Sequence, residues 1–321
     1  MTSKMHSVKL WATKIFSILL LATLFLLCMG CSVNTLVANA LTGEGGSTVF
    51  TGDPDPELVG DALPFAIKMY EALLDSTPKH QGLMFTTGSL LVMYANAYVH
   101  GPAEMLPVEE WHEREAGMQR AKTLYLRGSG ILYDALDAKY KGFAKTAAEG
   151  GDLQPILRKC KKKDAGLLYW AVAGGLAAFS IDVLDYDLSA RIPEWKAMIL
   201  RAYELDPDYG VAAIDEFFIL FYASLPEIMG GDRELAKVHF QRALDKTGGN
   251  SAGAYVSYAQ AICVADQDYD AYRDYLEKAI AVDPDADPST RLANIITQRK
   301  ARWLLDNAYI YFSFLPIPDG Y

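Results

Sequence analysis

Residues 83–99, 167–181 and 217–223 contain no charged residue, and these three stretches lie far apart in the sequence. Within each stretch the apolar positions run around the whole helical cylinder instead of following one face. A helix that is apolar on every side is stable only when other protein segments surround it. The pattern therefore predicts three buried helices that meet in the interior of the domain.

Amphipathic patterns elsewhere predict helices with one buried face. The run Asp53-Pro54-Asp55-Pro56 supplies cap residues and a first-turn proline, and apolar residues then recur at helical spacing as far as residue 74. Residues 109–140 alternate acids and bases with a thinner apolar pattern, which predicts a long amphipathic helix with a solvated polar face and a break near Gly128 and Gly130. No stretch shows the alternation of a strand, so the prediction is an all-α single domain of roughly ten to twelve helices.

Small residues in the second half of the chain recur at intervals close to those of a helical-hairpin repeat. Small side chains at such positions let neighbouring helices lie close together, as in tetratricopeptide units of about 34 residues. The hairpin before residue 243 lacks the Trp, Gly and Tyr positions of such a unit. The pattern therefore predicts degenerate tetratricopeptide-like hairpins and not a regular array, and it rests on Ala202, Ala236, Phe240, Ala243 and Ala279.

The amino terminus has the pattern of an export signal that ends at a cysteine. Lys4, Lys9 and Lys14 precede an apolar run at residues 15–27, which is shorter than the about 20 residues that span a bilayer. Gly30 before Cys31 suits lipoprotein processing, in which Cys31 becomes the lipidated first residue; the alternative is an ordinary cleaved signal and a coincidental cysteine. We expect a signal peptide at residues 1–30, a lipidated flexible tether at residues 31–54 and an α-helical domain at residues 55–321.

Charge and cysteine content limit the functional classes. The formal charge of −10 becomes −13 when the signal, with its three lysines and no acid, is removed. An acidic exported protein does not attract nucleic acid. Besides Cys31, only Cys160 and Cys263 remain in the mature chain, and a disulfide between them is left open. No Cys-x-x-Cys pattern indicates a metal or redox role.

Several motifs of catalytic or metal sites occur, and each has a simpler interpretation. Ser251 stands in a Gly-x-Ser-x-Gly pattern, but no strand precedes it and no histidine follows it, so we interpret it as a helix cap. Asp283, Asp285 and Asp287 have the spacing of a calcium loop, but Pro288 stands where that loop needs glycine. The five histidines show no paired ligand spacing. The sequence therefore predicts no catalytic residue, no metal site and no cofactor.

Other polar residues are interpreted from their place beside the buried stretches. The basic run at residues 158–163 is either a solvated helix end or a docking patch for an anionic surface. Asp164 is placed to cap the second buried helix, and Gly174-Gly175 to permit a close helix crossing. Asp215 and Glu216 precede the third stretch; adjacent helical residues point about 100° apart, so they are expected to serve as first-turn acids.

The three buried stretches carry many aromatic residues, and two interpretations of them are open. In the first, the aromatic side chains form ordinary core. In the second, they line a pocket or tunnel for an apolar or small organic solute, because a buried tyrosine hydroxyl needs a polar partner. The residues concerned are Tyr94, Tyr98, Tyr169, Trp170, Phe217, Phe221 and Tyr222.

The mature chain resembles the TRAP transporter T-component family, the TatT lipoproteins, along essentially its whole length. The resemblance is carried by runs spread through the sequence and not by generic repeat positions. These runs are Asp55-Pro56-Glu57-Leu58-Val59, Ala62-Leu63-Pro64-Phe65, Leu124-Tyr125-Leu126-Arg127, Leu167-Leu168-Tyr169-Trp170, Ala202-Tyr203-Glu204-Leu205-Asp206-Pro207-Asp208-Tyr209, Met229-Gly230-Gly231-Asp232, Ser251-Ala252-Gly253-Ala254-Tyr255-Val256-Ser257-Tyr258-Ala259, Leu292-Ala293-Asn294-Ile295-Ile296 and Arg302-Trp303-Leu304-Leu305.

The resemblance implies a non-enzymatic lipoprotein that is anchored to the inner or the outer membrane and faces the periplasm. It implies work beside a tripartite ATP-independent periplasmic transporter and association with the substrate-binding subunit. An internal channel and a homo-oligomer, with a trimer in view, are further implications that no particular residue of this chain carries. The competing hypothesis is a scaffold lipoprotein whose hairpins hold partners of envelope assembly.

Overall fold

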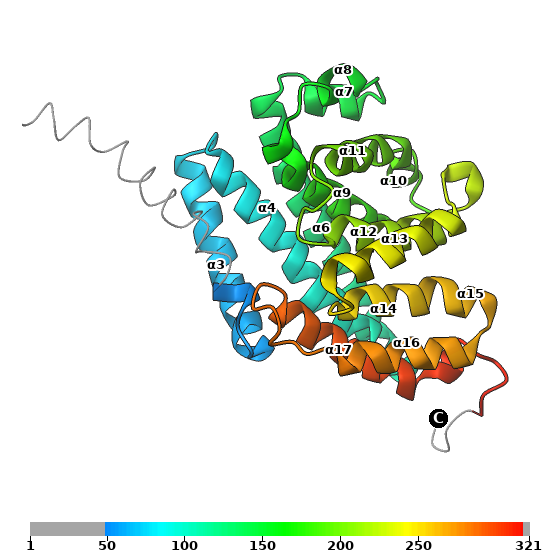
Figure 1. The fold of residues 1–321 in the computed structure, drawn as a ribbon. Coiled ribbons are helices and arrows are strands. Elements are labelled where there is room, and N and C mark those ends of the chain that lie inside the picture. Colours follow the sequence, from blue (N-terminus) through cyan, green and yellow to red (C-terminus); the bar gives the residue numbers. More distant parts are fainter. Residues whose placement is uncertain (1–48, 317–321) are drawn as a thin grey trace, which may run out of the picture.

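The computed structural model describes residues 49–316, and within this range the chain forms helices and no strand (Figure 1). The predicted all-α class is confirmed. Nine described helices have twelve or more residues: α3 (Pro56–Ser76), α4 (Gln81–Ala95), α6 (Trp111–Lys139), α9 (Ala165–Ile181), α11 (Ile192–Leu205), α12 (Ala213–Ser224), α13 (Arg233–Thr247), α16 (Tyr269–Ala281) and α17 (Arg291–Asp306). The shorter helices are α5 (Gly101–Glu104), α7 (Phe143–Ala148), α8 (Gln154–Leu157), α10 (Tyr186–Ser189), α14 (Ala252–Tyr258) and α15 (Val264–Asp266).

Helix α3 begins where the sequence predicts it. The Asp55 carboxylate accepts a hydrogen bond from the amide of Leu58, at 3.0 Å, and Pro56 occupies the first helical turn. Both features satisfy or avoid amide groups that have no partner inside the helix. Val59, Leu63 and other apolar residues of one face are buried against α4. The amphipathic pattern thus fixes which side of α3 faces the domain.

Helices α4, α6 and α9 pack together at the centre of the fold, and glycines set their spacing (Figure 1). A methyl group at Gly128 would lie 2.7 Å from the carbonyl oxygen of Gly88 in α4, and one at Gly174 would lie 3.1 Å from the carbonyl oxygen of Tyr125 in α6. The close crossing predicted for residues 174–175 is therefore confirmed. The predicted break near Gly128 and Gly130 is wrong, because α6 runs uninterrupted and Gly128 serves the contact with α4.

Helix α9 is the second buried helix of the prediction. Its stretch Lys162–Ile181 has the length and the apolar composition of a membrane-spanning helix, but most of that stretch is buried inside the domain, as in a core helix. Asp164 precedes α9 as expected, but its carboxylate turns back instead of capping the helix. It accepts hydrogen bonds from the Lys161 amide, at 2.8 Å, and from the Tyr140 hydroxyl, at 2.6 Å, and it pairs with Lys139. Asp164 therefore joins α9 to the end of α6.

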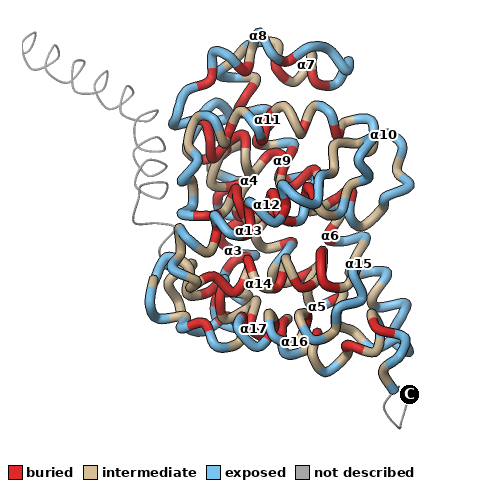
Figure 2. The backbone as a smooth tube through the Cα atoms, turned by 45° about the vertical axis from the view of Figure 1, so that its right-hand side comes forward, coloured by how far each residue is buried: buried red, intermediate tan, exposed pale blue. Residues whose placement is uncertain are grey.

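Helix α11 packs against α9, and helices α12 to α17 pack mainly against helices close to them in sequence, as pairs α12 with α13, α14 with α16 and α16 with α17. The buried positions lie where these helices face one another (Figure 2). Ala202, Ala236, Ala243 and Ala279 have no exposed surface, so the small residues of the repeat pattern do lie at helix contacts. The tetratricopeptide-like geometry of these hairpins stays a prediction.

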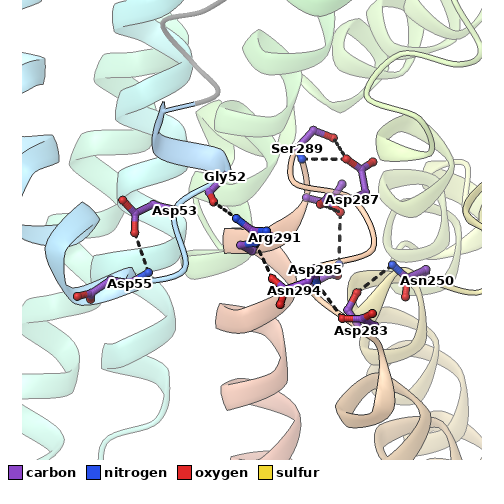
Figure 3. A network of polar contacts seen from close by, with 11 residues as sticks. Gly52, Asp53, Asp55, Asn250, Asp283, Asp285, Asp287, Ser289, Arg291 and Asn294 are labelled. Carbon is purple, nitrogen blue, oxygen red and sulfur yellow. Dashed lines mark hydrogen bonds and ion pairs between the residues drawn. The ribbon is translucent and has the colours of Figure 1, made fainter.

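The first described residues and the last long helix are joined. Arg291 donates a hydrogen bond to the Gly52 carbonyl at 2.7 Å and pairs with Asp285 at 2.7 Å (Figure 3). Arg299 of α17 contacts the carboxylate of Glu57 through both terminal nitrogens. Residues 49–54, which the prediction assigns to the tether, therefore already contact the domain. The signal peptide and the rest of the tether lie outside the described residues.

Candidate binding site

The aromatic residues of the predicted pocket fall into two groups. The first is a tyrosine pair, Tyr94 and Tyr98, whose rings stack with centroids 5.8 Å apart. The ring of Tyr98 lies over Gly60 of α3, where a methyl group would stand 2.7 Å from it. Burial raises the pKa of Tyr98 to about 12. Its hydroxyl has no hydrogen-bond partner among the described residues, so the ring is held by packing alone.

The second group, which we call the α9–α12 aromatic cluster, contains the other five predicted residues: Tyr169, Trp170, Phe217, Phe221 and Tyr222. Tyr169 and Phe217 join the two helices with their ring centroids 6.2 Å apart. Phe217 stacks on Phe221 at 5.8 Å, and Phe221 meets Tyr222 edge to face at 5.3 Å. The sequence therefore identified residues that meet in space, but it did not separate them from the tyrosine pair.

Tyr209 belongs to the same cluster and was not predicted as a site residue. Its hydroxyl accepts a hydrogen bond from the indole nitrogen of Trp170 at 3.0 Å, and its ring lies 5.5 Å from that of Tyr169. Gly166 of α9 leaves room for the ring, since a methyl group there would be 2.7 Å from it. The only sequence signal was the family-like run 202–209, because a loop residue shows no helical periodicity. Tyr209 supplies a polar partner for the partly buried indole.

A surface hollow of about 490 Å³ opens beside this cluster. Tyr209 belongs to both, and the basic pair Lys162 and Lys163 stands on the rim next to Asp206. Lys162 and Asp206 are 3.3 Å apart. The hollow thus combines an aromatic wall with charges of both signs. Its lining residues are Phe85, Lys162, Lys163, Gly166, Asp206 and Tyr209.

Two acidic residues, Asp215 and Glu216, lie in the first turn of α12 and have separate roles. Asp215 is fully buried, 2.7 Å from His239 Nδ1 and 2.7 Å from the ammonium of Lys246. Glu216 is half-buried, and the hydroxyl of Ser251 donates to its carboxylate at 2.5 Å. Burial raises the pKa of Glu216, against the lowering effect of that hydrogen bond. The expectation that both residues lie in the first turn of α12 is confirmed, but the buried pairing of Asp215 could not be read from the sequence.

Comparison with known proteins agrees with this architecture. The sequence model of the TRAP transporter T-component family matches residues 52–312. The chain belongs to the TRAP transporter T-component family. An uncharacterized protein of Treponema pallidum (strain Nichols) is 33% identical over 305 residues, which cover 89% of this chain and 94% of that protein. The family match begins and ends within a few residues of the described helical domain.

In this T-component, the residues that suggested other chemistry have structural partners. Ser251 caps α14, because its hydroxyl accepts a hydrogen bond from the amide of Ala254 at 3.3 Å. In the loop before α17, Asp283 accepts the amide of Asp285 at 3.0 Å, and Asp287 accepts the amide of Ser289 at 2.8 Å (Figure 3). Residues 49–316 contain no group of three His, Cys, Asp or Glu side chains that could hold a metal ion.

The cysteines and the basic run of this T-component were also interpreted from the sequence. Cys160 and Cys263 are buried, and both thiols are free. Cys31 lies outside the described residues, so its lipidation stays a prediction. The basic run at residues 158–163 is largely exposed, and its last two lysines border the hollow.

Proposed function

We propose that this chain is the lipid-anchored, periplasm-facing T-component of a TRAP transporter and that it associates with the substrate-binding subunit. The observation that carries the proposal is the family match across residues 52–312, which spans nearly all of the described domain. The export signal and Cys31 at the amino terminus support the anchor, and the acidic mature chain suits an extracytoplasmic protein. We propose no catalytic role for the chain.

The anchor is tested by Cys31→Ala in the full-length chain. The variant is expected to leave the membrane fraction, because the one described stretch that could span a bilayer is mostly buried in the domain. Fractionation after a salt wash and mass spectrometry of the mature amino terminus give the measurement. Membrane partition that persists in the variant, or an unmodified mature start, would contradict the anchor.

The partnership is tested with a TRAP-type substrate-binding protein from the same organism. We expect co-purification and a heat of binding in calorimetry, with a dissociation constant in the micromolar range that is typical of transient contacts. Absence of a complex at tens of micromolar, with and without solute, together with a gene neighbourhood that lacks transporter subunits, would favour the scaffold hypothesis.

We further propose that the α9–α12 aromatic cluster and the hollow beside it receive an apolar or small organic solute. Aromatic walls with a few convergent polar groups are the usual lining of small-molecule sites. Tyr169→Phe should change the affinity for an apolar dye such as Nile red with little loss of stability, because it removes only a hydroxyl. Trp170→Ala should lower both affinity and stability, because the ring fills space against Tyr169 and Tyr209. Equal dye binding by wild type and both variants would contradict the site.

A further inference from the structure

Glu216 of α12 carries a carboxylate that has no cation beside it. The hydroxyl of Ser251 donates to its Oε1 at 2.5 Å, and its Oε2 has no hydrogen-bond partner among the described residues. Burial is the main cause that raises the pKa of Glu216; the hydrogen bond from Ser251 lowers this pKa, and the like charge of Asp215 raises it. No described lysine, arginine or histidine acts on this pKa, so the charge of the carboxylate is not compensated.

The cations of this region belong to the neighbouring acid. Asp215 lies 2.7 Å from His239 and 2.7 Å from Lys246, and Lys246 also pairs with Asp208. Adjacent helical residues point about 100° apart, so these cations and Glu216 lie on different sides of α12. The first turn of a helix offers an acid only the partial positive charge of its amide groups. A carboxylate that is half-buried, unpaired and raised in pKa is more typical of a binding site than of a core.

The helix that contacts the carboxylate leaves its second oxygen free. Ser251 holds Oε1, and two residues later Gly253 stands beside Oε2, where a methyl group would lie 2.6 Å from that oxygen. Gly253 belongs to α14 and is not one of the glycines with positive φ, so its backbone conformation does not require glycine. The missing side chain instead keeps space beside Oε2. The carboxylate of Glu216 is therefore fixed by one oxygen and open at the other.

Aromatic rings stand close to this carboxylate. Phe217 follows Glu216 in the chain, and its ring centroid lies 6.2 Å from that of Tyr169 in α9. The pKa of Tyr169 is raised by burial first, and then by Tyr209 and by the charge of Glu216. The carboxylate is thus within electrostatic reach of the tyrosine. The faces of aromatic rings attract cations, and a carboxylate together with such rings is the combination that binds an organic ammonium group.

Other charged ligands fit this place less well. A calcium ion takes about six to eight oxygen ligands, and residues 49–316 hold no group of three acidic, histidine or cysteine side chains that could bind a metal ion. An organic anion would be repelled by the uncompensated charge of Glu216. Lys162 and Lys163 border the hollow, but neither acts on the pKa of Glu216. An organic cation needs only the one carboxylate and the rings.

We propose that Glu216 and the aromatic rings beside it bind the ammonium group of an organic cation that has an apolar body. This inference rests on the proposed solute site and names the class of solute that the site selects. The ammonium group lies at Glu216 Oε2, and the apolar body lies against Tyr169 and Phe217. The acidic mature chain adds a general attraction for such a solute.

Two probes of the same shape and different charge test the proposal at pH 7. Phenyltrimethylammonium is the cation and tert-butylbenzene is its neutral counterpart, and their affinities are measured by displacement of Nile red. Wild type should bind the cation about tenfold more tightly, and Glu216→Gln should remove this preference while it changes the affinity for tert-butylbenzene by less than about twofold. Glu109→Gln is the matched control, because it removes one exposed carboxylate and changes the net charge equally. Circular dichroism checks that each variant is folded.

A second variant keeps the charge and closes the space beside it. Gly253→Ala should weaken the binding of phenyltrimethylammonium more than that of tert-butylbenzene, because its methyl group meets Oε2. Gly130→Ala, where a methyl group has nothing within 4 Å, is its control and should change neither affinity. Nile red that does not bind wild type would remove the solute site itself, and this inference with it. Nile red binding combined with equal affinity for the two probes, or with equal losses in Glu216→Gln and Glu109→Gln, would overturn the cation inference alone.

Discussion

The buried contact between Asp215 and Lys246 allows a prediction about two substitutions that look equivalent and are not. The Asp215 carboxylate has no exposed surface and contacts His239, Lys246 and the hydroxyl of Tyr203, the last at 3.3 Å. The Lys246 side chain is 23% exposed and also lies 3.1 Å from Asp208. Removal of Lys246 leaves a buried carboxylate without its permanent cation, whereas removal of the carboxylate leaves a cation that can still reach water and Asp208.

The magnitudes follow from this asymmetry. Breaking a buried ion pair so that one charge stays uncompensated costs about 3–5 kcal/mol, so Lys246→Met should lower the free energy of unfolding by about that amount. Asp215→Asn keeps the shape and loses charge-assisted hydrogen bonds, which corresponds to about 1.5–3 kcal/mol. The double variant should cost less than the sum of the two, because the residues act on each other directly.

The pH dependence gives an independent readout of the same contact. Burial alone would raise the pKa of Asp215, but the hydrogen bonds and charges of His239 and Lys246 outweigh it, and the pKa lies below its ordinary value. A carboxyl group with a lowered folded pKa contributes stability that is present above its unfolded pKa of about 3.9 and is lost as the pH falls through the lower folded value. The loss of folding stability that comes from protonation of Asp215 at low pH should therefore be absent in Asp215→Asn.

Guanidinium unfolding of the mature chain, followed by circular dichroism between pH 3 and pH 8 in roughly unit steps, measures both effects. Asp187→Asn is the control, because Asp187 is an exposed acid and its substitution should change stability by less than about 0.5 kcal/mol. The reasoning is refuted if Asp215→Asn costs more than Lys246→Met, if the two effects add without interaction, or if the acid limb is unchanged in Asp215→Asn.

Three further substitutions test other contacts of the fold by thermal or chemical unfolding. Gly128→Ala should destabilise the fold by about 1–3 kcal/mol, because the added methyl group meets the backbone of α4. Gly130→Ala is the control and should stabilise the fold by about 0.5–1 kcal/mol, because an added methyl group there has nothing within 4 Å. Equal effects of the two substitutions would contradict the close contact between α4 and α6. Tyr98→Phe should keep or raise stability by about 1 kcal/mol, since it deletes a buried hydroxyl that has no partner among the described residues, and a clear loss would show that the hydroxyl is satisfied. Glu216→Gln should stabilise the fold slightly at pH 7, because the raised pKa of Glu216 in the folded chain means that its ionisation is unfavourable there. This gain should vanish below about pH 4, where the carboxyl group is protonated in both states. A loss of stability at pH 7 would contradict the effect of burial on Glu216.

The candidate site was predictable in its composition and not in its geometry. Charge-free stretches marked α4, α9 and α12 as buried, so the aromatic residues on them had to lie inside. Tyr94 and Tyr98 touch because they lie four residues apart on one helical segment, whereas the contact of Tyr169 with Phe217 depends on how α9 and α12 pack. The sequence pattern did not identify Tyr209 as a site residue, because Tyr209 lies in the loop between α11 and α12 and loops show no helical periodicity.

The sequence by itself determined the local structure of this protein. The cap and proline at residues 55–56, the charge-free stretches and the missing strand alternation are properties of neighbouring residues, and helix formation depends on such short spacings. Only the tertiary structure decided what each glycine and each buried charge is for. From the sequence, Gly128 was interpreted as a helix break, but in the structure it lies against Gly88 of α4. Asp215 was interpreted only as a first-turn acid, but in the structure its carboxylate pairs with His239 and Lys246 of α13. Contacts between residues far apart in the chain depend on how helices pack, and no local pattern records that packing.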